Sequence, residues 1–418
     1  MRSTLFFIPH QIFGVPLFGW GWVLGLLILA IIGSVILQRR SGLSWSEIVG
    51  GLTVWLLALP VIILVLPAVE QRWPDGTAMG LPVRGYGVMV LLGMLAGIGI
   101  TNIRARRLGL PTDLIVGLAV WAVLGGIVGA RAFYVVQKWE TFHGRGWQRV
   151  IEILKLTEGG LVVYGGIIGG VIAIVIYCYR HRLNLLATGD LVVPGFLVGL
   201  SLGRIGCLLN GCCFGGVCLA PLPVIHFPQG SLPYQVQLST GQLLGLQLSE
   251  TTLPSIIQSV QPGSVAESVG VRAGDQLRGI FTQSIEPYAG SDPTAPAPVL
   301  VDIKLDNSSK RILPDQLPVE SLPVHPAQIY ASLNALLLCL LIWQLQPLPS
   351  RDGLVFCVGV MLYATSRFLL ERIRSDEAGQ LGTDLTIAQL IALCTGALAF
   401  VGLLVLLRLP PKRAWTWV

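Results

Sequence analysis

Long runs of apolar residues, almost free of charge and each about 20 residues long, recur along the chain and constrain its fold more than any other feature. A helix of this length crosses the hydrocarbon core of a bilayer. Only 12% of the 418 residues are charged and 53% are hydrophobic, whereas a soluble domain carries about 25% charged residues. The sequence therefore predicts an all-α polytopic membrane protein, and it excludes a disordered chain, a small disulfide scaffold and a β-barrel.

About nine membrane spans are predicted, and a polar stretch interrupts them after the sixth. This stretch, residues 219–323, is rich in Pro, Ser and Gln and is long enough to form a domain. The predicted parts are therefore two N-terminal helices (1–75), a first part of the membrane core (76–218), the insertion (219–323) and a second part of the core (324–418). The predicted spans are 15–37, 47–69, 84–103, 114–136, 160–179, 188–209, 327–346, 353–371 and 385–407.

The loop charges predict the orientation of the chain. Arginines cluster at 104–107 and 180–182, in loops of the same side, and short loops rich in Lys and Arg face the cytoplasm. We therefore expect the N-terminus and the insertion to be extracytoplasmic and the C-terminus to be cytoplasmic. The net charge of +6 is modest, and no basic patch interleaved with aromatic residues indicates a nucleic-acid partner.

Four ionisable residues fall inside predicted spans, where a charge is costly and is a candidate functional group. They are Arg131, Arg204, Arg367 and Glu371. Arg367 and Glu371 are four residues apart, so they lie on one helical face as an ion pair. All four are predicted near the outer leaflet. The plain alternative is that they snorkel or pair structurally.

Arginine suits a phosphate ligand because its planar fork matches phosphate oxygens bidentately. Several arginines around a glycine-lined cavity would therefore bind a phospholipid head group, although interfacial anchoring to anionic lipid needs no such site. Other polar residues at the ends of spans join the candidates: Tyr86, Tyr164, Asn210, Gly215, His325, Tyr330 and Tyr363.

Five ordered motifs carry a family resemblance. The segment GRIGCLLNGCCFGG, residues 203–216, resembles the signature of the prolipoprotein diacylglyceryl transferase (Lgt) family. The motifs PVRGYGVMVLLG, GGLVVYGGIIGG, HPAQIY and RFLLERIR resemble other motifs of that family in the right order. The resemblance covers about 84–218 and 324–408, which contain seven of the nine predicted spans.

The resemblance implies a function. Members of this family transfer the sn-1,2-diacylglyceryl group of phosphatidylglycerol to the thiol of a lipobox cysteine in a prolipoprotein signal peptide, in the bacterial cytoplasmic (inner) membrane. It also implies residue roles. Arg204 matches the arginine that binds phospholipid, and Arg367 and Glu371 match a functional pair. Tyr86, Tyr363, Asn210 and Gly215 fall on motif positions. We assign catalysis to Arg204, Arg367, Glu371, Tyr86, Tyr164 and Asn210, and phosphatidylglycerol binding to Arg204, Arg131, Gly215, Tyr363, His325 and Tyr330.

The chain departs from the family pattern at several positions. Tyr164 stands where many members have a histidine considered as the base, and Ala331 replaces a frequent Glu. Cys207 and Cys212 stand where many members have Asn and Glu. The general base therefore stays open between Glu371, Tyr164 and a thiol next to arginines.

The insertion resembles a PDZ-like domain over about 232–318. Residues 256–280 have the strand, Pro-Gly turn, short helix and Ala-Gly-Asp turn of bacterial PDZ modules, and residues 244–246 could form a carboxylate-binding loop. Such domains bind a peptide as an added strand. The alternative is a spacer without a ligand.

Three other functions compete with the transferase. An intramembrane protease is disfavoured, because the chain has no H-E-x-x-H motif. The segment GLSLG, residues 199–203, fits G-x-S-x-G but lies in a predicted span without the strand–turn–helix context of a nucleophilic serine. A metal site at Cys207, Cys212, Cys213 and Cys218 lacks the usual C-x2-C pairs, and outside the cytoplasm a disulfide or thiols are favoured. We therefore predict no metal and no cofactor. An inactive phospholipid-binding scaffold remains as the alternative.

Overall fold

The computed structural model describes residues 4–41, 59, 61–73, 75–144, 146–155, 159–218, 221–250, 253–284, 299–306, 308–348, 350–374, 379 and 382–415. The chain forms two compact units. Unit 1 comprises Met1–Gly87, Leu209–Cys212 and Val224–Pro323. Unit 2 comprises Val88–Leu208, Cys213–Pro223 and Val324–Val418, and it holds most of the long helices.

Eight helices of the described part are long and apolar enough to cross a membrane. They confirm eight of the nine predicted spans, and the chain is a multi-pass membrane protein. The predicted span 47–69 lies mostly outside the described residues; its end forms a π-helix, Val61–Val65, and α3, Leu66–Val69. The eight helices are α1 (Trp22–Arg40), α4 (Gly85–Arg107), α5 (Thr112–Gln137), α7 (Val163–Arg180), α8 (Leu185–Asn210), α11 (Ala327–Leu345), α12 (Leu354–Glu371) and α13 (Ile387–Arg408).

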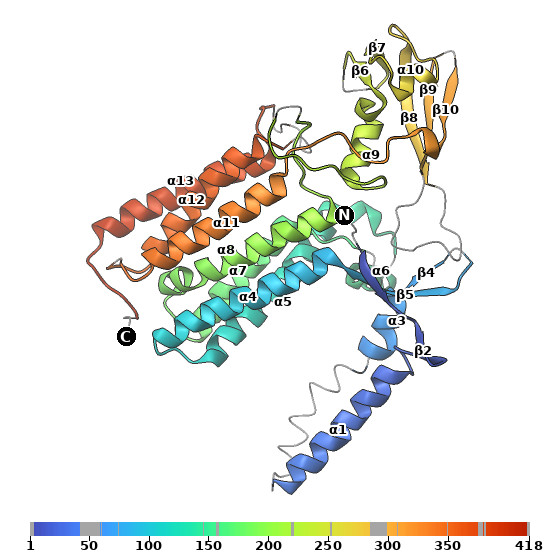
Figure 1. Ribbon diagram of the computed structural model, residues 1–418. Coiled ribbons are helices and arrows are strands. Elements are labelled where there is room, and N and C mark those ends of the chain that lie inside the picture. Colours follow the sequence, from blue (N-terminus) through green and yellow to red (C-terminus); the bar gives the residue numbers. More distant parts are fainter. Residues whose placement is uncertain are drawn as a thin grey trace. The chain divides into compact units, whose positions relative to one another are not determined.

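Glycines allow close helix packing in unit 2. Helices α5 and α7 lie side by side (Figure 1), and a Cβ added at Gly129 would lie 2.4 Å from the carbonyl oxygen of Gly165. A Cβ at Gly97 of α4 would likewise lie 2.6 Å from the carbonyl oxygen of Gly195 in α8. Small residues at such contacts let helix backbones approach in lipid, where van der Waals packing drives association.

Buried polar contacts align the three helices that carry the candidate site. The hydroxyls of Ser201 in α8 and Ser332 in α11 are 3.0 Å apart. Asn334 of α11 donates a hydrogen bond to Ser366 of α12 over 2.9 Å. At the other end of α12, the Asp190 carboxylate accepts from the main-chain N–H groups of Gly353 and Phe356, each at 2.7 Å. These bonds satisfy donors that a helix N-terminus otherwise leaves without partners.

A 3-10 turn (Trp139–Thr141) follows α5, and a short amphipathic helix, α6 (Trp147–Leu154), precedes α7. The apolar positions of α6, residues 147, 150, 151 and 154, share one face by helical spacing, and all four are exposed. In the sequence, α6 lies between the two spans α5 and α7.

The N-terminal part of unit 1 contains two small antiparallel sheets. One has the strand order β1-β5-β4, formed by Thr4–Ile8, Ala78–Arg84 and Gln71–Arg72. The other pairs β2 (Gln11–Ile12) with β3 (Val15–Pro16).

The insertion forms a five-stranded antiparallel sheet with the order β10-β9-β8-β7-β6. Its core centres on Tyr234, whose ring is fully buried and whose hydroxyl donates to the Pro318 carbonyl over 2.8 Å. Opposite each other on neighbouring strands, Arg311 and Asp302 form an ion pair that lowers the pKa of the Asp302 carboxyl. The elements are α9 (Leu232–Ser239), a 3-10 turn (Gln242–Leu244), β6 (Leu246–Leu248), β7 (Ser255–Val260), α10 (Val265–Ser268), β8 (Gln276–Ser284), β9 (Val299–Leu305), β10 (Ser309–Ile312) and a 3-10 turn (Pro314–Gln316).

Candidate active site

A three-residue ionic cluster marks the C-terminal end of α12. Oε2 of Glu371 lies 2.8 Å from Nη1 of Arg367 and 3.2 Å from Nη1 of Arg374. The Glu371 side chain is fully buried, and its Oε1 has no hydrogen-bond partner among the described residues. The Arg367 side chain is 16% exposed. The predicted Arg367–Glu371 pair is therefore present, and it leaves one buried carboxylate oxygen available.

Sequence reasoning missed the third member of this cluster. Arg374 is not among the residues predicted for the site, because it lies beyond the predicted span 353–371. Arg374 follows Glu371 by three residues, a spacing at which charged side chains meet in a helical turn. The motif RFLLERIR therefore contained the signal.

Arg204 lies on α8, close to α12. It is half-buried and contacts the Tyr363 side chain through a hydrogen bond. Tyr363 precedes Arg367 by four residues and Glu371 by eight, so the three share one side of α12. The structure therefore brings Arg204, Tyr363, Arg367 and Glu371 to one region of unit 2.

The glycine segment after α8 joins this region to the start of α11. The N–H of Gly215 donates to the carbonyl of His325 over 3.1 Å, and the N–H of Gly216 donates to that of Ile373 over 2.9 Å. A Cβ at Gly215 would lie 2.6 Å from the Cβ of His325, so the close approach requires glycine. The main chain at Gly215 and His325 thus fixes the end of α12 relative to α11.

Arg131 has different surroundings. Its residue is 9% exposed, and its guanidinium lies 5.3 Å from the centroid of the Tyr134 ring. An arginine side chain has five N–H donors. They are taken up by five main-chain carbonyls at 2.7 to 3.2 Å, those of Glu152, Ile153, Lys155, Gly159 and Gly160.

The remaining candidates lie near the ends of helices. Tyr164 is 36% exposed in the first turn of α7. Tyr330 is half-buried on α11, with its hydroxyl 3.5 Å from the Pro223 carbonyl oxygen. Tyr86 is 44% exposed at the start of α4, and Asn210 is exposed at the end of α8. The last two belong to unit 1.

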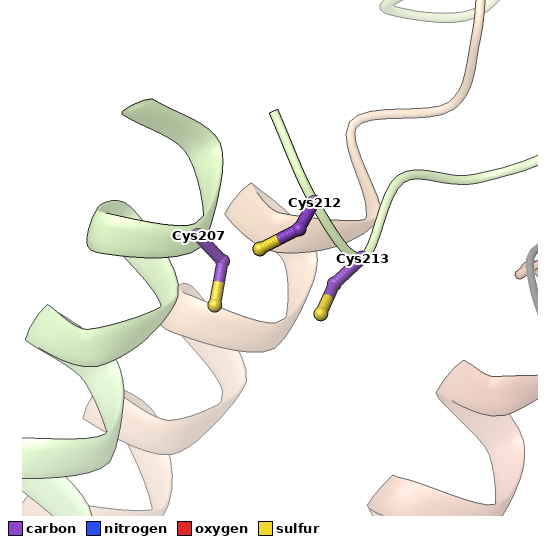
Figure 2. A group of neighbouring side chains, drawn as sticks. All are labelled: Cys207, Cys212 and Cys213. Carbon is purple, nitrogen blue, oxygen red and sulfur yellow. The ribbon is translucent and has the colours of Figure 1, made fainter. Parts of the chain in front are cut away.

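Cysteine side chains gather in the stretch 207–213, at the end of α8 and in the following turn. The sulfur atoms of Cys207, Cys212 and Cys213 lie within 4.8 Å of one another, and Figure 2 shows them as one group. Cys207 and Cys213 also interact electrostatically with Arg204. The sequence showed the spacing of these residues but not that their sulfur atoms meet.

The comparisons with known proteins agree with the motifs. The family described as "Prolipoprotein diacylglyceryl transferase" matches residues 76–406. The chain is 36% identical to the phosphatidylglycerol–prolipoprotein diacylglyceryl transferase of Rhodopirellula baltica, over 97% of this chain and 89% of that protein. It is 34% identical to the enzyme of that name from Clostridium tetani, over 39% of this chain and 64% of the relative. A third relative of that name, from Deinococcus radiodurans, is 39% identical over 30% of this chain and 38% of its own length.

Proposed function

Because the chain belongs to the prolipoprotein diacylglyceryl transferase family, we propose that it transfers the diacylglyceryl group of phosphatidylglycerol to the lipobox cysteine thiol of a prolipoprotein. The product is a thioether. The sulfur forms a bond to the glycerol carbon that carries the phosphate ester, the bond from that carbon to oxygen breaks, and glycerol phosphate leaves. The reaction therefore needs a site for an anionic leaving group and an acceptor for the thiol proton.

The charges around α12 carry this proposal. Three guanidinium groups, those of Arg204, Arg367 and Arg374, accompany one carboxylate, that of Glu371. Among the described residues these four groups sum to an excess of two positive charges. The side chains of Arg367, Arg374 and Glu371 are mostly buried, and a buried charge requires compensation. A phosphodiester supplies one negative charge, and the departing glycerol phosphate supplies up to two. The cluster therefore stabilises the leaving group more strongly than the bound substrate, which is the condition for lowering the barrier.

Glu371 is the proton acceptor in this proposal. Its Oε2 is held by two arginines, whereas Oε1 is buried and has no partner among the described residues. An oriented carboxylate oxygen of this kind accepts a proton from an incoming thiol. Tyr363 acts by holding Arg204, through the hydrogen bond between them. Tyr164, exposed at the start of α7, is the alternative acceptor.

The other predicted site residues take positioning roles in the proposal. Gly215 and His325 join the ends of α11 and α12 through main-chain hydrogen bonds. Arg131 holds residues 152–155 and 159–160, because its five donors point to main-chain carbonyls there. Roles for Tyr86, Asn210 and Tyr330 in contacting the substrates remain predictions.

A transfer assay tests the function. The full chain is reconstituted in vesicles of phosphatidylcholine with radiolabelled phosphatidylglycerol, and a lipobox peptide is added. The label is expected to appear on the peptide only when it carries the lipobox cysteine, and glycerol phosphate is expected in equal amount. Arg180 is exposed at the C-terminal end of α7, opposite to the end that carries Tyr164. Arg180→Ala is the matched control and is expected to retain activity. Phosphatidylglycerol binding without transfer would instead identify an inactive scaffold.

We also propose that the chain lies in the bacterial cytoplasmic membrane with the insertion outside. The support is the arginine density of the alternate loops. Ser268 is exposed in α10, so Ser268→Cys is expected to react with a membrane-impermeant maleimide in intact cells above the level of the unsubstituted chain. Reaction only after permeabilisation would reverse the orientation.

For the insertion we propose a peptide ligand that adds as a strand to β6. β6 is an edge strand of the described sheet, and Gly245 directly before it has φ +80. A labelled peptide with a free carboxyl terminus is expected to bind the full chain, and its C-terminal amide is expected to bind more weakly. Equal binding of the two peptides would contradict carboxylate recognition.

A further inference from the structure

Two cysteines of unit 2 meet at the end of α8. Cys207 lies in the last turn of the helix, Cys213 follows the turn, and their sulfur atoms are within 4.8 Å of each other (Figure 2). Both are thiols rather than disulfides in this structure. A disulfide requires about 2.05 Å between sulfur atoms, so the two side chains have to move closer together to form one.

The main chain of the turn holds Cys213 in an unusual conformation. Its φ is +59, and Gly211 two residues earlier has φ +73. Residues with a side chain rarely adopt positive φ, and where they do the surrounding structure maintains the strain. Gly and Asn adopt a positive φ more readily than cysteine does. The turn therefore places a thiol at a position where either of those residues would be less strained.

The pair adjoins the arginine assigned to the phosphate. Cys207 follows Arg204 by three residues on α8, so their side chains lie on one face. Both cysteines interact electrostatically with the Arg204 guanidinium. A thiolate at either position would offset the positive charge that attracts a phosphate.

We propose that Cys207 and Cys213 form a reversible disulfide that controls the binding of phosphatidylglycerol at Arg204. Oxidation joins the two sulfur atoms, and two protons and two electrons leave. The electrons reduce the disulfide of a thiol oxidoreductase or of a small disulfide compound by thiol–disulfide exchange. The orientation proposed above places the pair on the extracytoplasmic side, where disulfides persist.

The direction of control follows from the charges. In the reduced protein, either thiol can ionise, and the thiolate then competes with the phosphate for the guanidinium. A disulfide is neutral and cannot ionise, so oxidation leaves the Arg204 charge to the lipid. The apparent KM for phosphatidylglycerol should therefore fall on oxidation, by about fivefold or more, the usual lower range for coupling between two sites. This inference rests on the proposed function.

The first measurement does not depend on activity. The full chain in detergent is equilibrated with reduced and oxidised glutathione at several ratios, alkylated and digested, and the disulfide is mapped by mass spectrometry. A Cys207–Cys213 link is expected under oxidising conditions, and dithiothreitol should remove it. The link should disappear in Cys207→Ser and in Cys213→Ser, and it should persist in Cys394→Ser, an exposed cysteine of α13.

The second measurement gives the consequence. The KM for phosphatidylglycerol is measured with a lipobox peptide in the oxidised and reduced proteins. In the double variant Cys207→Ser with Cys213→Ser, the KM should be the same under both conditions and close to the oxidised value, because neither hydroxyl ionises. Cys394→Ser should keep the difference.

Three results would overturn the proposal: a disulfide through Cys212 in place of this pair, stoichiometric zinc bound by the thiols in the purified protein, or a KM that is unchanged by a mapped Cys207–Cys213 link. A protein that forms the link but transfers no diacylglyceryl group in either state would refute the proposed function instead.

Discussion

Two arginines of unit 2 occupy superficially similar positions in membrane helices and have opposite surroundings. Arg131 on α5 directs all five of its donors to main-chain carbonyls of residues 152–160. Arg204 on α8 is half-buried, forms a hydrogen bond with the Tyr363 side chain and interacts electrostatically with Cys207 and Cys213. We therefore expect a ligand at Arg204 rather than at Arg131, whose five donors are all taken up by the protein.

Arg131 has a structural explanation that is complete. Three of its acceptors, Glu152, Ile153 and Lys155, are carbonyls at the C-terminal end of α6. The last carbonyls of a helix have no partner within it, and a cation there also complements the helix dipole. The arginine therefore fastens α6 to α5 and fixes the approach of the chain to α7.

The largest effect is expected at the carboxylate. Glu371→Gln removes the proposed proton acceptor and leaves two arginines without their shared anion. The rate of transfer should fall by about 10²–10⁴, the usual contribution of a positioned acid or base. Glu371→Asp keeps the charge and should recover part of the rate. Glu320→Gln, at an exposed position of the insertion, is the control. A Glu371→Gln enzyme with full activity would transfer the role of base to Tyr164.

Arg204 comes next. Arg204→Ala should lose roughly 2–4 kcal/mol of transition-state stabilisation, or about 10²–10³ in kcat/KM, as on removing one preorganised donor. Arg204→Lys should recover only part, because an ammonium does not reproduce the bidentate fork. The assay uses membranes with equal amounts of each folded variant. Full activity in Arg204→Ala would mean that the phosphate is bound elsewhere, with Arg367 the first candidate.

Arg131 should behave differently under substitution. Arg131→Ala leaves five carbonyls without their donor and should lower the free energy of unfolding by about 3 kcal/mol. Arg131→Lys supplies three donors in place of five and should recover part of that stability. Thermal unfolding in detergent measures both variants. The folded fraction should keep the KM for phosphatidylglycerol. A raised KM in folded Arg131→Lys would restore the predicted role in substrate binding and remove the contrast with Arg204.

The contrast also shows what the sequence could predict. Apolar runs located eight described spans, because hydrophobic length is a local property. Helical spacing predicted the Arg367–Glu371 pair for the same reason. The acceptors of Arg131 could not be foreseen, because the carbonyls of residues 152, 153, 155, 159 and 160 reach α5 only through tertiary packing. The meeting of the thiols of Cys207 and Cys213 depends on a turn with positive φ, which the cysteine spacing alone does not encode.

The smallest effect tests the packing that supports Arg131. Gly129 precedes it by two residues, and a Cβ there would lie 2.4 Å from the Gly165 carbonyl oxygen and 2.7 Å from the Gly169 Cα. Both are main-chain atoms, so α5 and α7 must separate in Gly129→Ala, at a cost of about 1–3 kcal/mol. Gly126→Ala on the same helix is the matched control, because its nearest neighbour, the Gly166 carbonyl oxygen, is 3.4 Å away.

Thermal unfolding of the two variants separates steric cost from helix propensity, which favours alanine over glycine at both positions. Gly126→Ala should match or exceed the original stability, and only Gly129→Ala should fall below it. If the packing of α5 against α7 fixes the position of Arg131, the separation of these helices in Gly129→Ala displaces its guanidinium. The end of α6 is then no longer held, so protease cleavage within 145–158 should increase. Equal stability of the two variants would mean that α5 and α7 are not packed at glycine contact distance, and the account of Arg131 would then need another support.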